Sequence, residues 1–258
     1  KLIRLTMTIN SFKKKILAWD ELEKNFYIIK NNINIKTEEL LFIKRQQQIL
    51  LENTILFAQG KPSNNGLLWG ARGTGKSSLI FSVFNDVKEN YNISLLEVKR
   101  NQMKYINTIL RQLEKIDQKT IIFFDDFSFI SKSEDFITFK NILDGAVSKN
   151  MNYLFYVTSN FRSLIQYNDN KLNMDLIEQK EALDNETALS DRFGIWLGFE
   201  KFTNNQYLEI VNYYCLKFNV KNKKEFTTSK ALQWSLNRGA KSGREAYHFV
   251  KSLHNKKI

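Results

Sequence analysis

One eight-residue segment constrains this chain more than any other. Residues 70–77 read GARGTGKS and fill every fixed position of G-x-x-x-x-G-K-[ST], the phosphate-binding loop. The apolar stretch Leu67–Trp69 precedes it, and the helix-forming stretch Ser78–Phe81 follows it. Glycines let consecutive backbone N–H groups point at a phosphate, and the new helix adds its positive end. The alternative is an ordinary glycine-rich turn. The setting predicts binding of a nucleoside triphosphate by Gly70, Ala71, Arg72, Gly73, Thr74, Gly75, Lys76, Ser77 and Ser78.

The composition is that of a folded protein without an internal disulfide. With 258 residues, of which 43% are hydrophobic, the chain is long enough for one large domain or a domain with a small appendage. Its single cysteine, Cys215, excludes an internal disulfide and a metal site built from several cysteines. No apolar run in the sequence approaches the roughly 18 residues that a membrane helix needs. We therefore expect a cytoplasmic protein with no membrane partner.

The chain is strongly basic, with a formal net charge of +12. Such a balance can indicate a nucleic-acid partner. The same composition also arises without any such partner, because lysine far outnumbers arginine, asparagine and isoleucine are abundant, and there is one proline, as an AT-rich genome would encode. No helix-turn-helix or basic recognition helix is recognisable. Charge alone leaves a nucleic-acid client and a protein client both open.

The pattern of apolar residues divides the chain into three parts. In residues 1–36, Ile16, Leu17, Trp19 and Leu22 have the spacing of one helix face, which predicts an N-terminal helical extension. Residues 37–200 alternate strand-like and helix-like stretches, whereas residues 201–258 are helical. The strand-like stretches are residues 67–69, 93–98, 120–124, 152–157 and 195–199. This order predicts an α/β fold with a five-stranded parallel sheet flanked by helices, followed by a small helical domain.

Two acids end the third of these strands. The apolar stretch Ile121–Phe124 leads directly into Asp125 and Asp126, about fifty residues after Lys76. An Asp at the end of such a strand holds Mg²⁺ together with the hydroxyl of the phosphate loop, here Ser77. The second acid, Asp126, can polarise an attacking water. The alternative is that both acids merely end the strand and cap the following loop.

The fourth strand also ends in polar residues. The apolar run from Tyr153 is followed by Thr158, Ser159 and Asn160. A polar side chain at this position lies between two neighbouring strand ends and can bond the γ-phosphate or the water. Asn160 is the candidate for this role, and a turn asparagine that only ends the strand is the alternative.

In this order and spacing, the three motifs resemble those of an AAA+ ATPase. The chain resembles more closely a bacterial family designated domain of unknown function 815, over residues from about Thr37 to His254. The stretches that carry this resemblance are Asn53–Thr54, Asn64–Ser78, Asp125–Phe129 and Leu189–Gly194. The resemblance implies an AAA+ core at residues 37–200, a helical lid at residues 201–258, and binding of ATP.

The resemblance also assigns roles to two arginines. Arg192 matches the arginine that AAA+ proteins present to the γ-phosphate of a neighbouring subunit, which implies a homo-oligomer; a surface ion pair with Asp191 or Glu186 is the alternative. Arg244 resembles the lid arginine that responds to bound nucleotide, and a surface charge at a helix N-terminus is the alternative. The sequence departs from the family after Asn160, where the family usually has two successive arginines and this chain has Phe161 and Arg162, so the first arginine is absent.

These residues predict an ATPase with ATP and Mg²⁺ as cofactors. Lys76 neutralises the β- and γ-phosphates, Ser77 and Asp125 hold the metal, Asp126 and Asn160 orient the water, and Arg192 completes the neighbour's site. Mechanical ATPases usually carry Glu where this chain has Asp126, which leaves open a nucleotide-gated switch or a nucleic-acid loader with slow hydrolysis. A small-molecule kinase would leave the lid and the two arginines unexplained.

Overall fold

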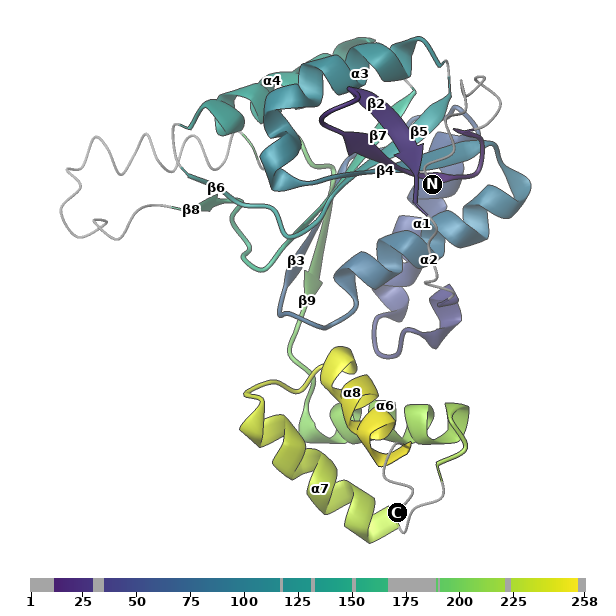
Figure 1. Ribbon diagram of the computed structural model, residues 1–258, viewed down its shortest axis with the longest axis vertical. Helices are drawn as coiled ribbons and strands as arrows, with labels where there is room; N and C mark the ends of the chain where they lie inside the picture. Colours follow the sequence, from purple (N-terminus) through teal and green to yellow (C-terminus); the bar gives the residue numbers. More distant parts are fainter. Residues whose placement is uncertain are drawn as a thin grey trace, which may run out of the picture.

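The computed structural model describes residues 12–29, 35–116, 118–130, 133–149, 152–166, 189, 191–220 and 224–254. It consists of an α/β core and a smaller group of helices joined to it after the last core strand (Figure 1). The polar and charged stretch at residues 167–187 and, closer to Arg192, Ser190 lie outside the described residues.

The core is built on a sheet whose five central strands are parallel. Their spatial order is β4 (Ile93–Val98), β5 (Lys119–Phe124), β7 (Tyr153–Ser159), β3 (Gly66–Gly70) and β9 (Ile195–Phe199). These are the five strands predicted from the sequence, and the predicted fold class is confirmed. β3 pairs in parallel with β7, and β7 pairs in parallel with β5. The carboxyl ends of these three strands therefore lie at the same edge of the sheet, and the loops that follow them meet there.

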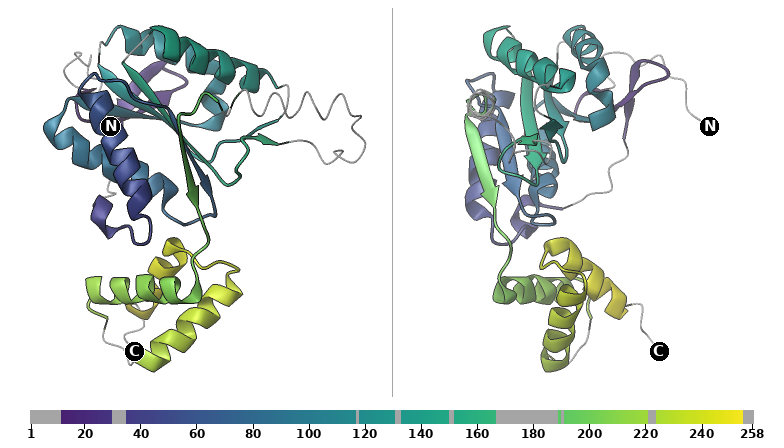
Figure 2. Two further views of the ribbon diagram at one scale, coloured as in Figure 1. Left: turned by 180° about the vertical axis from the view of Figure 1, so that it is seen from behind. Right: turned by 90° about the vertical axis from the view of Figure 1, so that its left-hand side faces the viewer.

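Helices cover both faces of this sheet (Figure 2). On one face, α1 (Lys44–Ala58) and α2 (Lys76–Asn90) bury side chains such as Leu50 and Phe84 against alternate residues of the strands. On the other face lie η3 (Arg100–Tyr105), α3 (Ile106–Glu114) and α4 (Glu134–Lys149), with a core rich in phenylalanine. Short elements complete the core: η2 (Thr37–Glu39), β6 (Phe129–Ile130) and β8 (Ile165–Gln166).

The predicted N-terminal helix is wrong. Its described residues form a hairpin of β1 (Ile16–Asp20) and β2 (Asn25–Ile28), and β1 pairs in parallel with β4, so the sheet has seven strands. The side chains of Leu17 and Trp19 enter one core of the sheet, and that of Ile16 enters the other. A continuous apolar run suits a strand buried on both faces better than one face of a helix. Leu22, which we placed on the helix face, is 94% exposed at the hairpin turn.

Three helices form the lid, namely α6 (Asn204–Lys217), α7 (Lys224–Asn237) and α8 (Gly243–His254), and they enclose a small core of their own. The lid touches the phosphate loop directly, since the backbone N–H of Gly243 donates to the carbonyl of Gly73 at 2.9 Å. An ion pair between Lys217 and Glu39 joins α6 to η2 at 2.9 Å. The lid therefore rests against the segments that flank the loop.

None of the described helices is both long enough and apolar enough to cross a membrane.

Candidate active site

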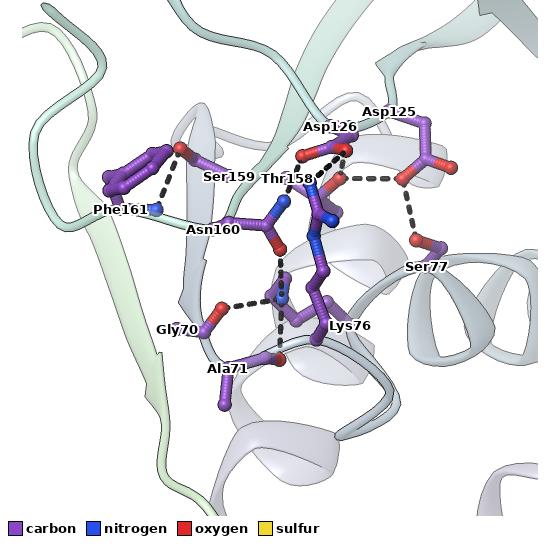
Figure 3. A network of polar contacts seen from close by, with 11 residues as sticks. Gly70, Ala71, Lys76, Ser77, Asp125, Asp126, Thr158, Ser159, Asn160 and Phe161 are labelled. Carbon is purple, nitrogen blue, oxygen red and sulfur yellow. Dashed lines mark hydrogen bonds and ion pairs between the residues drawn. The ribbon is translucent and has the colours of Figure 1, made fainter. Parts of the chain in front are cut away.

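The carboxyl ends of β3, β5 and β7 bring the predicted residues together at one edge of the sheet (Figure 3). Lys76 and Ser77 begin α2 directly after the loop, Asp125 and Asp126 follow β5, and Asn160 follows β7. Gly73 and Gly75 have positive φ angles of 72° and 101°, which allow the loop to fold back between the strand and the helix. Along the chain, Asp125 lies 48 residues from Ser77 and Asn160 lies 84 residues from Lys76, and they meet at one site in the fold.

Lys76 lies at the centre of this arrangement and is 7% exposed. Its ammonium group donates to the carbonyls of Gly70 at 2.7 Å and Ala71 at 2.8 Å, and it lies 3.4 Å from the side-chain oxygen of Asn160. Burial lowers the pKa of Lys76 to about 8, although the carboxylates of Asp126 and Asp125 act in the opposite direction. A buried cation held mostly by carbonyls is well placed to exchange these partners for an anion.

Asp125 is held by two hydroxyl groups. Ser77 and Thr158 each donate to the same carboxylate oxygen of Asp125 at 2.6 Å. Thr158 also accepts from the backbone N–H of Asp126 at 2.8 Å, so one side chain fixes both acids. We did not predict a role for Thr158, although it stands in the polar strand end that we singled out.

The oxygen set fits Mg²⁺. The Ser77 hydroxyl and the Asp125 carboxylate are hard oxygen ligands that lie together at the foot of the loop. Mg²⁺ typically takes one or two such protein ligands, and its other ligands are water and substrate phosphates. The described part of the chain has no group of three or more His, Cys, Asp or Glu residues that could hold a metal ion.

Asp126 and Asn160 face each other across the site. The side-chain amide of Asn160 donates to the Asp126 carboxylate, and the guanidinium of Arg72 lies 3.8 Å from its other oxygen. The side chains of Arg72 and Asp126 are 79% and 60% exposed, so this ion pair is open to solvent and weak. Asp126 adopts a positive φ of 53°, a conformation that Asp tolerates better than most residues.

A cavity of about 550 Å³ lies above these groups, between core and lid. The core contributes the loop, Asp125, Asp126 and Asn160, and the lid contributes Arg244. Apolar and aromatic side chains line the cavity as well: Leu40, Leu41, Ile210, Tyr213, Tyr214 and Tyr247. This last group could not be predicted from the sequence, because its members share no local motif: they come from the residues after η2 and from the two lid helices α6 and α8.

Arg192 lies elsewhere. It is not among the described residues that line the cavity, and its guanidinium forms a two-pronged ion pair with Asp144 of α4, with Nε–Oδ1 and Nη2–Oδ2 distances of 2.5 and 2.8 Å. The alternative we considered was an ion pair with Asp191 or Glu186. The pair seen is with Asp144, and Glu186 lies outside the described residues.

The family model described as "Protein of unknown function (DUF815)" matches residues 13–257. The chain belongs to this family. None of the curated proteins matches the DUF815 chain.

Several solved structures have a similar fold. The RuvB Holliday junction branch migration motor of Thermotoga maritima matches with a TM-score of 0.56 and 16% identity, over 86% of this chain and 65% of that one. AMPPCP-bound DnaA from Aquifex aeolicus matches with a TM-score of 0.58 and 16% identity, over 89% and 68% of the two chains. The DUF815 chain thus spans slightly less than two thirds of the RuvB chain. RuvB and DnaA are AAA+ P-loop ATPases, so the DUF815 chain has the AAA+ fold.

One further acid escaped the sequence analysis. Glu97 is on β4, next to β5, and burial raises the pKa of its carboxyl group. The nearby charge of Asp125 raises that pKa further, whereas Lys99 lowers it. Glu97 lies within the strand rather than in the polar segment that follows it, so no motif in the sequence pointed to it.

Proposed function

We propose that this protein is an AAA+ ATPase that binds Mg-ATP in the cavity between core and lid and couples its binding or hydrolysis to a conformational change in an oligomer. The observation that carries the proposal is the convergence of Lys76, Ser77, Asp125 and Asn160 at one strand edge, beneath a cavity of about 550 Å³. The likeness to RuvB and DnaA supports the fold on which the proposal rests.

Each residue of the core has a defined task in this proposal. Lys76 releases the loop carbonyls and neutralises β- and γ-phosphate oxygens, while the backbone N–H groups of residues 72–78 bind the phosphates. Ser77 and Asp125 hold the metal, and Thr158 keeps Asp125 oriented toward it. Mg²⁺, when bound, withdraws charge from the transferring phosphoryl group. Asp126 and Asn160 together orient the attacking water.

The lid supplies the other wall of the site. Tyr213, Tyr214 and Tyr247 offer aromatic surface on which a base can lie. Arg244 lines the same cavity, and its charge helps to lower the pKa of Lys76, which places the two cations near each other. A triphosphate relieves this repulsion between the two cations. Arg244 therefore couples nucleotide binding to the position of the lid.

Arg192 completes the site of a neighbouring copy. A guanidinium offers planar donors to the charge that develops on the transferring phosphoryl group. Since Arg192 is not among the described residues of its own cavity, this role requires a second copy of the chain. The proposal therefore includes a homo-oligomer in the ATP-bound state.

ATPase measurements on three variants test the proposal. Lys76→Ala and Arg192→Ala are each expected to lower turnover by about 10²-fold or more, as loss of a charge-stabilising donor does in other active sites. The matched control is Lys44→Ala, which removes an exposed lysine from the start of α1. Wild-type turnover by both site variants would show that the site assignment is wrong.

Asp126 favours a second candidate, a switch that hydrolyses ATP slowly. Its side chain is one methylene shorter than the Glu usual at this position, and both of its carboxylate oxygens already have a partner in Asn160 or Arg72. If slow hydrolysis reflects this short reach, Asp126→Glu raises turnover while ATP affinity stays the same. An unchanged low rate in this variant would favour the switch.

The client of such a switch is proposed to be a nucleic acid. The net charge of +12 supports this choice, and so does the likeness to RuvB, a Holliday junction branch migration motor. Binding to single- or double-stranded DNA should weaken steeply as salt increases, because each phosphate contact releases counterions. Absence of binding at low salt, with and without ATP, would rule out this client.

A further inference from the structure

The ion pair between Asp144 and Arg192 is side-on and well formed. Both carboxylate oxygens of Asp144 accept from the guanidinium, at 2.5 Å from Nε and 2.8 Å from Nη2. The Arg192 side chain is 20% exposed, whereas that of Asp144 is 49% exposed. Hydrogen bonding to Arg192 holds the pKa of Asp144 below its usual range, so the carboxylate stays charged at neutral pH. Paired hydrogen bonds of this type fix orientation as well as distance.

Both partners stand on rigid parts of the core. On α4, the residues Phe139 and Leu143 that precede Asp144 are fully buried. On the other side, Leu189 and Phe193 bracket Arg192 and are almost fully buried. The rings of Phe139 and Phe193 lie 6.5 Å apart, so the helix and the turn pack against each other next to the ion pair. The packing of these neighbours thus fixes the backbone positions from which Asp144 and Arg192 extend.

We propose that Asp144 is a positioning residue for Arg192, orienting its guanidinium for the active site of the neighbouring copy. This inference rests on the proposed function. A free arginine side chain samples many rotamers, and each must be given up when it binds a phosphoryl oxygen. Asp144 restricts those rotamers beforehand, because it accepts from both Nε and Nη2 of the guanidinium. The transition state then meets a cation that is already ordered.

An alternative role for Asp144 is to sequester Arg192, and the two roles predict opposite changes in turnover when Asp144 is replaced. If the carboxylate merely kept Arg192 away from the neighbour, removing its charge would raise turnover. If Asp144 acts through position, its loss slows the reaction, because small misplacements of a catalytic group have large effects on rate. The sign of the change in kcat therefore separates the two roles.

A double-mutant cycle in ATP turnover by the full chain tests the proposal. Asp144→Asn keeps the shape of the side chain, and it should lower kcat by about tenfold, with the KM for ATP changed by less than about twofold. In the background of Arg192→Ala, the same substitution should have no further effect on kcat, because the group that it orients is gone. Asp135→Asn removes an exposed carboxylate from the first turn of the same helix and should leave turnover unchanged.

Each outcome has one meaning. Faster turnover by Asp144→Asn overturns the proposal in favour of sequestration. An equal loss in both backgrounds, or a lower melting temperature that accounts for the loss, shows that Asp144 is merely structural. Wild-type turnover by Lys76→Ala would mean that the proposed function has failed, and this inference with it. A slow Lys76→Ala variant beside an unaffected Asp144→Asn variant overturns this inference alone.

Discussion

Around the phosphate loop, polar and charged groups from several elements are interlinked beside the buried Lys76, whereas Arg192 and Asp144 form an ion pair away from the cavity. Lys76 is 7% exposed, and Asp125 accepts from two hydroxyls that come from different elements. The Asp144 side chain, in contrast, is 49% exposed. Both regions hold a cation near a carboxylate. Lys76 and Asp125 line the cavity, whereas Arg192 and Asp144 are not among its described lining residues.

This difference indicates how the two regions can work. Groups that line one cavity in one chain can act on the same triphosphate without a partner. In the proposed function, Arg192 is absent from the described lining of that cavity and reaches a triphosphate through a second copy of the chain. The loop region is therefore the half of the site within one chain, and the Arg192 region is proposed as the half that it lends to a neighbour.

The largest expected effect comes from mixing two inactive variants. Lys76→Ala and Arg192→Ala each lack one half of the site, but a mixed oligomer contains interfaces that have both halves intact. Turnover should therefore rise from about 10²-fold below wild type to a substantial fraction of it, with a maximum near equal mixing. The measurement is ATPase activity against mixing ratio.

The control for this experiment is the double variant that carries both substitutions in one chain. When it is mixed with Lys76→Ala, no interface has an intact loop, so activity should stay low. If Lys76→Ala and Arg192→Ala show no recovery at any ratio, the two regions do not belong to different subunits of one site.

The next effect is the pH dependence of ATP binding. The pKa of Lys76 is lowered to about 8 in the free protein, so the ammonium group loses its proton as pH rises through that value. ATP affinity should then fall by up to about tenfold per pH unit above pH 8, because each mole of ATP bound must restore one proton. Titration calorimetry between pH 7 and 9.5 measures this dependence.

The same shift affects the stability of the nucleotide-free protein. Between pH 8 and the ordinary lysine pKa of 10.5, the unfolded chain binds more protons than the folded one, so the contribution of Lys76 to the unfolding free energy rises with pH. Lys76→Arg, which keeps its charge throughout, serves as the control and should flatten both dependences. Equal slopes for the two proteins would contradict the assignment to Lys76.

Thr158→Val should have a smaller effect. It removes a hydrogen bond to Asp125 and leaves the backbone N–H of Asp126 without its acceptor, which costs about 1–2 kcal/mol of unfolding free energy. Turnover should fall by about tenfold, since both acids lose a common support. Thr120→Val is the control, because this buried threonine of β5 bonds a carbonyl away from the acids. Denaturant unfolding measures the loss of stability, and ATPase assays measure the loss of turnover. Equal losses of turnover in Thr158→Val and Thr120→Val would contradict the role of Thr158.

The smallest effect concerns the contact between loop and lid. A methyl group added at Gly73 would lie 2.6 Å from the Ser242 side chain, whereas at Gly239 it would meet nothing within 4 Å. Both glycines have positive φ angles, 72° and 66°, so Gly73→Ala and Gly239→Ala share a strain of about 1–2 kcal/mol. Gly73→Ala alone should also weaken ATP binding by about fivefold, as expected for one lost hydrogen bond from the lid. Equal ATP affinities for the two variants would show that the contact has no part in binding.

Most of the α/β core could be predicted from local patterns. The five parallel strands and the segment from Gly70 to Ser77 are each recognisable within a few residues, because strand burial and loop geometry depend on neighbours in the chain. The hairpin of β1 and β2 was missed for a related reason. The apolar run Ile16–Trp19 suits a helix or a strand, and the turn from Asp20 to Asn25 contains no Gly or Pro to mark it.

Contacts between distant segments could not be predicted in this way. Thr158 bonds Asp125 because β5 and β7 are neighbours in the sheet, and Asp144 meets Arg192 across 48 residues of sequence. Tyr214 and Tyr247 meet in the lid with their ring centroids 5.5 Å apart, although each looks like an ordinary helix residue. None of these pairs has a spacing that a periodic pattern reveals.

The amino-acid sequence by itself therefore determined the phosphate loop, the two acids after β5, Asn160 and the five strand-like stretches of the core. These features follow from backbone conformation and burial along short stretches. Tertiary structure alone decided that β1 extends the sheet, that Thr158 supports both acids, and that Asp144 rather than Asp191 pairs with Arg192. The physical reason is that hydrogen bonds and ion pairs between side chains depend on which segments the folded core brings into contact. Local apolar patterns show which residues are buried, but they do not show which distant segments pack together.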